Sequence, residues 1–228
     1  MNRKGFIISI CLFTAFVLWT VAVCLVDVQA IGPQDSSVGF AGINQFVHNL
    51  TGVHFGLYIM TDWLGLVPIF VCMGFAILGL TQWIKRKSIR KVDRDILALG
   101  GFYILTIAAY LLFENVVINY RPVLINGYLE ASYPSSTTLL VMCVMPTAVM
   151  QLRCRIKNKT LRCCVTAIIC TFIAFMLIGR LVSGVHWFTD IVGGVLLSTG
   201  LVTLYCAVNK WLQKTVEEIA CGVICKAQ

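Results

Sequence analysis

Residues 179–194 read GRLVSGVHWFTDIVGG, and apolar runs long enough to cross a membrane flank this stretch on both sides. The stretch carries Arg180, His186 and Asp190 in a chain of which only 12% of the residues are charged. Ionisable side chains beside membrane-spanning segments are costly to keep, and they often mark a functional site. The stretch therefore predicts a membrane protein with a polar site close to one membrane surface.

The composition indicates a polytopic membrane protein. Hydrophobic residues make up 59% of the 228 residues and the mean hydropathy is +0.88, whereas soluble domains are about 45–50% apolar. Because each crossing needs about 20 apolar residues, the length suits one bundle, and no repeat or linker marks a second domain. We expect an all-α protein in which residues 1–228 form a single six-helix membrane domain. The six apolar segments cover about 5–26, 63–84, 96–119, 135–152, 163–180 and 187–208.

The first apolar segment has two interpretations. It begins with the basic sequence MNRK and ends in VQA, as a cleaved signal peptide would. Its apolar run is longer than the run of about 7 to 15 residues that signal peptides carry. We therefore favour a retained first membrane helix and keep cleavage as the alternative.

The basic residues are distributed very unevenly along the chain. If the six helices alternate in direction, sixteen of the eighteen Lys and Arg residues fall on one side of the membrane. The positive-inside rule makes that side cytoplasmic, which predicts a multi-pass protein of the plasma (cytoplasmic) membrane with both termini in the cytoplasm. The net charge of +8 is then a topology signal, and we expect no nucleic-acid partner. The sixteen residues are Arg3, Lys4, Lys85, Arg86, Lys87, Arg90, Lys91, Arg94, Arg153, Arg155, Lys157, Lys159, Arg162, Lys210, Lys214 and Lys226.

The cysteines argue against an external disulfide framework. None of the eleven falls in the predicted external stretches 27–62 and 120–134. Most are expected to be small apolar packing residues. Acylation or metal binding stays open for Cys163, Cys164, Cys221 and Cys225.

Arg121 and Arg180 are the two basic residues on the predicted external side, where three separate segments meet. The segments are ENVVINYRPVL (114–124), YPSSTTLL (133–140) and the stretch 179–194. Arginine carries a planar, permanently charged fork that matches phosphate oxygens. The two exceptions to the topology rule are therefore candidates for binding a phosphate.

The start of the fourth helix and a His/Asp pair would complete such a site. A helix N-terminus presents free N–H groups to an anion, and Ser135, Ser136 and Thr137 add hydroxyl donors. His186 and Asp190 are four residues apart and share a helix face, so the carboxylate can orient the imidazole. A serine-rich helix start alone is ordinary capping, whereas its combination with the arginines and this pair points to phosphate chemistry.

In this order, the Arg-Pro, Pro-Ser and Arg-x5-His-x3-Asp motifs resemble the type 2 phosphatidic acid phosphatase superfamily, which includes the vanadium haloperoxidases. The family pattern is Lys-x6-Arg-Pro, Pro-Ser-Gly-His and Ser-Arg-x5-His-x3-Asp, and the motif region covers about residues 110–200 here. The resemblance implies a membrane-embedded lipid phosphatase that hydrolyses a phosphomonoester or pyrophosphate at the external face.

The resemblance also implies a role for each motif residue. His186 would attack phosphorus to form a phosphohistidine, and Asp190 would orient and stabilise it. Arg121 and Arg180 would bind the phosphate oxygens together with the Ser135–Thr137 helix start. Water would then release phosphate. This scheme requires no metal and no other cofactor.

Two positions depart from the family pattern. Glu114 stands seven residues before Arg121, where the family has Lys, and Thr137 replaces the His of the second motif. That His is the family's general acid, and general acid catalysis is worth about 10²- to 10⁴-fold. We favour Glu114 as the substitute acid because it is close to Arg121 in sequence. The other external candidates are His48, His54, Asp62 and Glu130.

The departures leave two further classes of function open. The chain could be a weak or inactive family member that binds a phosphorylated lipid or serves as a membrane scaffold. It could also be an anion transporter, although its two external arginines lie at one face rather than at the bilayer midplane. The lipid itself is left open among phosphatidate, phosphatidylglycerol phosphate and a polyprenyl pyrophosphate, and so is the oligomeric state.

Overall fold

The computed structural model describes the backbone of residues 3–226 and the side chains of residues 3–213. This part of the chain is helical, and its only β pairings are isolated bridges. Two short 3-10 turns, η1 (Pro33–Asp35) and η2 (Ile89–Lys91), lie in the connections. The α-helices are α1 (Arg3–Leu25), α2 (Ala41–Thr51), α3 (Phe55–Leu64), α4 (Leu66–Arg86), α5 (Arg94–Asn115), α6 (Ser136–Arg155), α7 (Lys159–Val182) and α8 (Phe188–Lys226).

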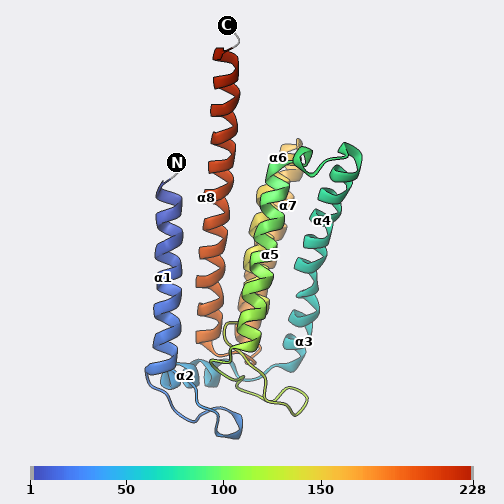
Figure 1. The fold of residues 1–228 in the computed structure, drawn as a ribbon. Helices are drawn as coiled ribbons and strands as arrows, with labels where there is room; N and C mark the ends of the chain where they lie inside the picture. The colour runs from blue at the N-terminus through green and yellow to red at the C-terminus, as the bar shows by residue number, and fades with distance from the viewer. Residues whose placement is uncertain (1–2, 227–228) are drawn as a thin grey trace.

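The described chain has six helical segments long and apolar enough to cross a membrane, which confirms the six-helix prediction. They run side by side in one bundle (Figure 1). α3 and α4 together form one of these segments, Phe55–Arg86, because the backbone of Gly65 between them is itself helical. The sequence prediction began this segment at residue 63 and assigned residues 27–62 to the external side. In the structure Asp62 is paired with Arg180, so the polar residue is accommodated within a helix.

Two other differences concern the loops. The third membrane helix ends at Asn115 rather than at residue 119, because Val116 adopts an extended conformation that β-branched residues favour. The stretch read as an external loop also contains α2, which lies across the end of the bundle (Figure 1). Asn44 of α2 is fully buried and donates to the hydroxyl of Thr189 at 3.0 Å. The Thr189 N–H donates in return to the Asn44 side-chain oxygen at 3.2 Å. These bonds fix α2 to the start of α8.

α6 and α8 form the centre of the bundle, with about half of each membrane segment buried. Within lipid, apolar surface alone does not drive helices together, so close packing at small residues matters more. A Cβ added at Gly193 of α8 would lie 2.6 Å from the Tyr133 ring, and one at Gly194 would lie 3.1 Å from Thr138. These two glycines therefore let the α8 backbone approach the start of α6. That contact brings the His186 and Asp190 region against residues 133–138.

The two ends of the bundle differ in composition. The connections 116–135 and 183–187 lie at the same end as α2, at the bottom of Figure 1. The connections 87–93 and 156–158 lie at the opposite end, together with the start of α1. We call this opposite end the basic end, because it carries the clusters of Lys and Arg around residues 85–94 and 153–162.

Candidate active site

A polar cavity of about 260 Å³ lies at the end opposite the basic end. Its walls come from α3, α5, α6 and α7 and from the two connections at that end, 116–135 and 183–187. Segments far apart in the sequence thus share one cavity, as the three-segment prediction required. The lining residues are Tyr58, Asp62, Tyr110, Phe113, Glu114, Arg121, Glu130, Ala131, Ser132, Tyr133, Pro134, Ser136, Thr137, Leu139, Arg180 and His186.

His186 lies in the connection between α7 and α8 with its ring almost fully buried. Its Nε2 atom is 3.1 Å from one guanidinium nitrogen of Arg180 and 3.5 Å from one of Arg121. A guanidinium can only donate, so these contacts are hydrogen bonds when Nε2 is unprotonated and accepts. Burial, followed by the positive charges of Arg121 and Arg180, lowers the pKa of His186 well below its usual range. The ring is therefore neutral at pH 7 and presents a lone pair towards the two arginines.

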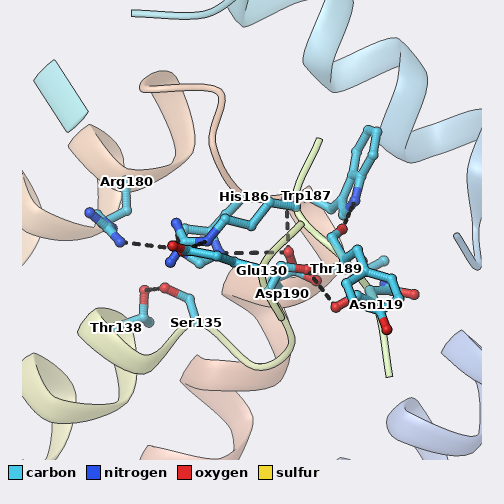
Figure 2. Close-up of polar contacts among 12 residues, drawn as sticks. Asn119, Glu130, Ser135, Thr138, Arg180, His186, Trp187, Thr189 and Asp190 are labelled. Atoms are coloured by element: carbon cyan, nitrogen blue, oxygen red, sulfur yellow. Dashed lines mark hydrogen bonds and ion pairs between the residues drawn. The ribbon is translucent and has the colours of Figure 1, made fainter. Parts of the chain in front are cut away.

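Asp190 lies behind the ring, in the first turn of α8, and is completely buried. Its Oδ2 is 3.7 Å from Nδ1 of His186, which is longer than a hydrogen bond. The same oxygen accepts the backbone N–H of Trp187 at 2.9 Å (Figure 2). The side chains of Asn119 and Ser132 lie next to the carboxylate. The carboxylate is thus held by its neighbours in position beside Nδ1. Catalytic hydrogen bonds without a ligand are often long, and they tighten in the complex.

The two arginines approach His186 from different elements. Arg180 is in the last turn of α7 and is 1% exposed, and its guanidinium lies 3.6 Å from Asp62. Arg121 is in the connection after α5 and is 9% exposed, and its Nε lies 3.1 Å from Glu130. Each buried guanidinium therefore has one carboxylate partner, which offsets part of the cost of burying its charge.

Tyr58 of α3 is a site residue that the sequence reasoning missed. Its ring lies 5.2 Å from the guanidinium carbon of Arg180 and 5.9 Å from that of Arg121. Both distances are within the range of a cation–π interaction. The only available signal was helical spacing, since Tyr58 and Asp62 are four residues apart and lie on one face of α3. The Tyr58 ring therefore helps to hold both guanidinium groups beside His186.

The start of α6 contributes two of its three predicted residues to the cavity. Ser136 and Thr137 line the cavity, whereas Ser135 does not. The Ser135 hydroxyl accepts a hydrogen bond from Thr138 at 3.1 Å, and its backbone N–H donates to the Asp190 carbonyl at 3.1 Å. The Ser135 side chain makes no capping bond. The first N–H groups of α6 consequently have no side-chain cap and can bind an anion.

The five candidates for a substitute acid separate into two groups. Asp62, Glu114 and Glu130 line the cavity, whereas the two histidines do not. His48 faces the Trp187 ring, and Nε2 of His54 contacts the Thr51 carbonyl at 2.9 Å. Among the three carboxyl groups, Asp62 and Glu130 are the arginine partners described above.

Glu114 is the remaining carboxyl group, and it comes from the last turn of α5. Within residues 3–213 it takes part in no ion pair. Among the described residues it is therefore the cavity carboxyl group without an arginine partner.

Comparison with known proteins agrees with this geometry. The family model of the PAP2 superfamily matches residues 68–214, which is more than half of the chain. The chain belongs to the PAP2 superfamily. This confirms the family to which the three motifs point. No curated protein matches the chain in a sequence search.

A solved PAP2 structure shares the fold of this PAP2 protein. The chain is similar to the crystal structure of a transmembrane PAP2-type phosphatidylglycerolphosphate phosphatase from Bacillus subtilis, with a TM-score of 0.59. The sequences are 18% identical, and the match covers 89% of this chain and 96% of that one. At this identity the likeness establishes a common membrane fold over nearly the full length of both proteins.

Proposed function

We propose that this PAP2 protein is a membrane lipid phosphatase that hydrolyses a phosphomonoester or pyrophosphate of a lipid through a phosphohistidine on His186. The observation that carries the proposal is the contact of Nε2 of His186 with both buried guanidiniums. This arrangement places the nucleophile, a neutral imidazole, next to two guanidinium groups that can bind a phosphate. A cavity of about 260 Å³ accommodates a phosphate group, and the lipid chains would remain outside it.

The first chemical step uses the lone pair of His186. When phosphate oxygens take the N–H donors of Arg121 and Arg180, Nε2 is released and can attack phosphorus in line with the departing oxygen. The N–P bond forms as the P–O bond to the lipid breaks. The ring then becomes positively charged, and Asp190 stabilises that charge through Nδ1. Buried arginines stabilise the charge on the transferred phosphoryl group at little reorganisation cost.

The second step returns the enzyme to its starting state. Water attacks the phosphohistidine, its oxygen bonds to phosphorus, and the N–P bond breaks to release inorganic phosphate. The electron pair of that bond returns to Nε2. Glu114 supports both steps in this proposal, because it lines the cavity and its carboxyl group has no arginine partner among the described side chains. It would protonate the departing lipid oxygen first and accept a proton from water next.

The missing motif His points to the kind of leaving group. Thr137 cannot donate a proton at neutral pH, so a leaving group that needs no protonation should depart faster than one that relies on Glu114 as its only acid. A monoester expels an alkoxide, whereas a lipid pyrophosphate expels a phosphate that is already a stable anion. We therefore infer a preference for lipid pyrophosphates, with phosphatidate and phosphatidylglycerol phosphate as slower substrates.

The orientation in the plasma membrane forms part of the proposal. The basic end would lie in the cytoplasm with both termini, and the cavity would open at the external face. Single cysteines at Ser88 and Asn126, in a cysteine-free background, test this with a membrane-impermeant thiol reagent. Labelling from outside is expected at Asn126→Cys only. Labelling at Ser88→Cys and protection of Asn126→Cys would reverse the orientation.

The activity is tested by phosphate release in vesicles that contain phosphatidate, phosphatidylglycerol phosphate or a polyprenyl pyrophosphate. The parent protein is compared with His186→Ala and with His48→Ala, a matched control because His48 contacts Trp187 but does not line the cavity. We expect release by the parent and by His48→Ala, and none above background by His186→Ala.

The second candidate function is a non-catalytic binder of a phosphorylated lipid. Thr137 in place of the acid His is the observation that favours it. If the parent hydrolyses none of the three lipids while Thr137→His does, this second function replaces the first.

A further inference from the structure

A second hollow lies between α4 and α5, and it shares no lining residue with the candidate active site. Its volume is about 680 Å³, and its lining is almost entirely apolar. On α4 it runs from Ile69 to Trp83, and a rise of about 1.5 Å per residue makes this stretch about 21 Å long. One leaflet contributes about half of a hydrocarbon core of about 30 Å, so the groove is long enough for one whole acyl chain.

Glycines leave the groove open on the α5 side. Gly100 and Gly101 line it, and a Cβ added at either would meet no atom within 4 Å. Tyr103 and Ile107 continue the wall towards the middle of α5, while Trp83 closes the end nearest the connection 87–93. Tryptophan is enriched where lipid tails meet headgroups. The groove therefore ends at the level where a lipid headgroup would begin.

The connection 87–93 places positive charge directly at this end of the groove. Ile89 and Val92 of the connection line the groove. Lys87, Arg90 and Lys91 stand beside them and are exposed.

Within residues 3–213, none of these three basic residues forms an ion pair. The two acidic residues nearby are already engaged. Asp93 is 2.7 Å from Arg86, and Asp95 is 2.8 Å from Arg155. The uncompensated charge at the mouth of an apolar groove is complementary to an acidic headgroup with a tail.

We propose that this groove binds one acyl chain of an anionic phospholipid whose headgroup phosphate contacts Lys87, Arg90 and Lys91. Lipid tails touch every outer surface of a membrane protein, and the hollow with its charged end is what makes this surface selective. Juxtamembrane Lys and Arg residues attract acidic lipids with an energy that corresponds to roughly fivefold in affinity for each charge. The site is independent of the proposed phosphatase chemistry, because its ligand is a phosphodiester and lies at the basic end.

Native mass spectrometry of the purified full chain in detergent tests the proposal. The protein is titrated with phosphatidylglycerol or with phosphatidylcholine of the same acyl chains, and the affinity for the first bound lipid is measured. We expect phosphatidylglycerol to bind at least tenfold more tightly. Equal binding of the two lipids by the parent would overturn the proposal.

Two sets of variants locate the site. Gly100→Leu with Gly101→Leu fills the groove and should remove the preference, whereas Gly74→Leu is its control on α4, since Gly74 has open space but does not line the groove. Replacing Lys87, Arg90 and Lys91 by Gln should lower phosphatidylglycerol affinity to the phosphatidylcholine level. The matched control replaces Lys157 of the connection 156–158 and Lys159 at the start of α7, and it should leave the affinity unchanged.

Folding of each variant is checked by size-exclusion chromatography and thermal melting. Unchanged phosphatidylglycerol affinity in both a folded groove variant and the folded charge variant contradicts the assignment. A parent dimer that the groove-filling change converts to monomer, with phosphatidylglycerol affinity unchanged, would show that a second copy of the chain occupies the groove instead.

Discussion

Arginines lie at both ends of the bundle, and those at the cavity are more deeply buried than those at the basic end. At the cavity, Arg180 and Arg121 are 1% and 9% exposed, each has a carboxylate partner, and both contact the Tyr58 ring. At the basic end, Arg90 and Arg94 are exposed and form no ion pair within the described side chains, residues 3–213. A buried guanidinium must be compensated by fixed partners, whereas an exposed one is solvated by water and headgroups.

The contrast separates two uses of the same side chain. In our proposals, charge at the basic end would set the orientation and attract lipid headgroups, and its exact position would matter little. Charge at the cavity is held by Asp62, Glu130 and Tyr58 beside His186, and there position matters greatly. Substitutions that preserve charge but change geometry should therefore affect only the cavity end.

The largest expected effect is that of Arg180→Lys. Lysine keeps the charge but loses the planar fork, so phosphate release should fall by about 10²- to 10³-fold. Arg90→Lys at the basic end is the matched control and should stay within about twofold of the parent. Phosphate release from the preferred lipid measures both. A loss of activity in Arg90→Lys comparable to that in Arg180→Lys would remove the distinction between the two ends.

The acid at the cavity end should be revealed by paired substitutions. If Glu114 protonates the leaving oxygen, Glu114→Gln should slow hydrolysis of phosphatidate by about 10- to 100-fold and hydrolysis of a lipid pyrophosphate much less. Thr137→His should instead accelerate phosphatidate hydrolysis most. Steady-state kcat is measured for each variant with phosphatidate and with the lipid pyrophosphate, and the ratio of the two values is compared with that of the parent. Equal effects of Glu114→Gln on both lipids would indicate a binding role rather than proton donation.

The arginines should also influence the acidic limit of activity. Burial, followed by the positive charges of Arg121 and Arg180, lowers the pKa of His186, so the nucleophile stays unprotonated below the ordinary value of 6.5. As the pH falls through the lowered pKa, His186 gains a proton and activity is lost. Arg121→Gln removes one positive charge and raises that pKa, so the acidic limb of kcat/KM should move to higher pH. If the acidic limb of the kcat/KM profile has the same position in the parent and in Arg121→Gln, the group that titrates there is not His186.

The smallest expected effect is at an ion pair of the basic end. Arg86 and Asp93 are 2.7 Å apart, but their side chains are 43% and 39% exposed. Such pairs contribute about 0–1 kcal/mol, so Arg86→Gln should change the melting temperature by only a degree or two. Arg180→Gln leaves Asp62 without its ion-pair partner and removes the shorter of the two arginine contacts of His186, and we expect it to lower the melting temperature clearly more. A larger loss of melting temperature in Arg86→Gln than in Arg180→Gln would contradict the view that the buried arginine contributes more to stability.

Much of the fold could be predicted because lipid imposes a simple rule. Six apolar segments must be helices, and because successive helices alternate in direction, their connections fall at two opposite ends of the bundle. α2 escaped this reasoning because an amphipathic helix of eleven residues is too short to span the membrane. Its position depends on the buried pairing of Asn44 with Thr189, two residues that are 145 positions apart.

The site was only partly predictable, for a related reason. Arg121, Arg180, His186 and Asp190 belong to motifs, and the structure places them together around the cavity. Tyr58 belongs to no motif, and its role follows from how α3 packs on α7. Gly179 of α7 permits that packing, since a Cβ there would lie 2.8 Å from Thr61. Ser135 was expected to face the phosphate, but its hydroxyl is engaged with Thr138.

The most direct test of the central claim is to trap the phosphohistidine. The parent protein is mixed with a lipid pyrophosphate labelled in its terminal phosphate and quenched in alkali, where an N–P bond survives, and the labelled peptide is mapped. We predict label on His186 that appears before free phosphate, is lost in acid and is absent from His186→Ala. Label on another residue, or equal phosphate release by the parent and His186→Ala, would contradict the account.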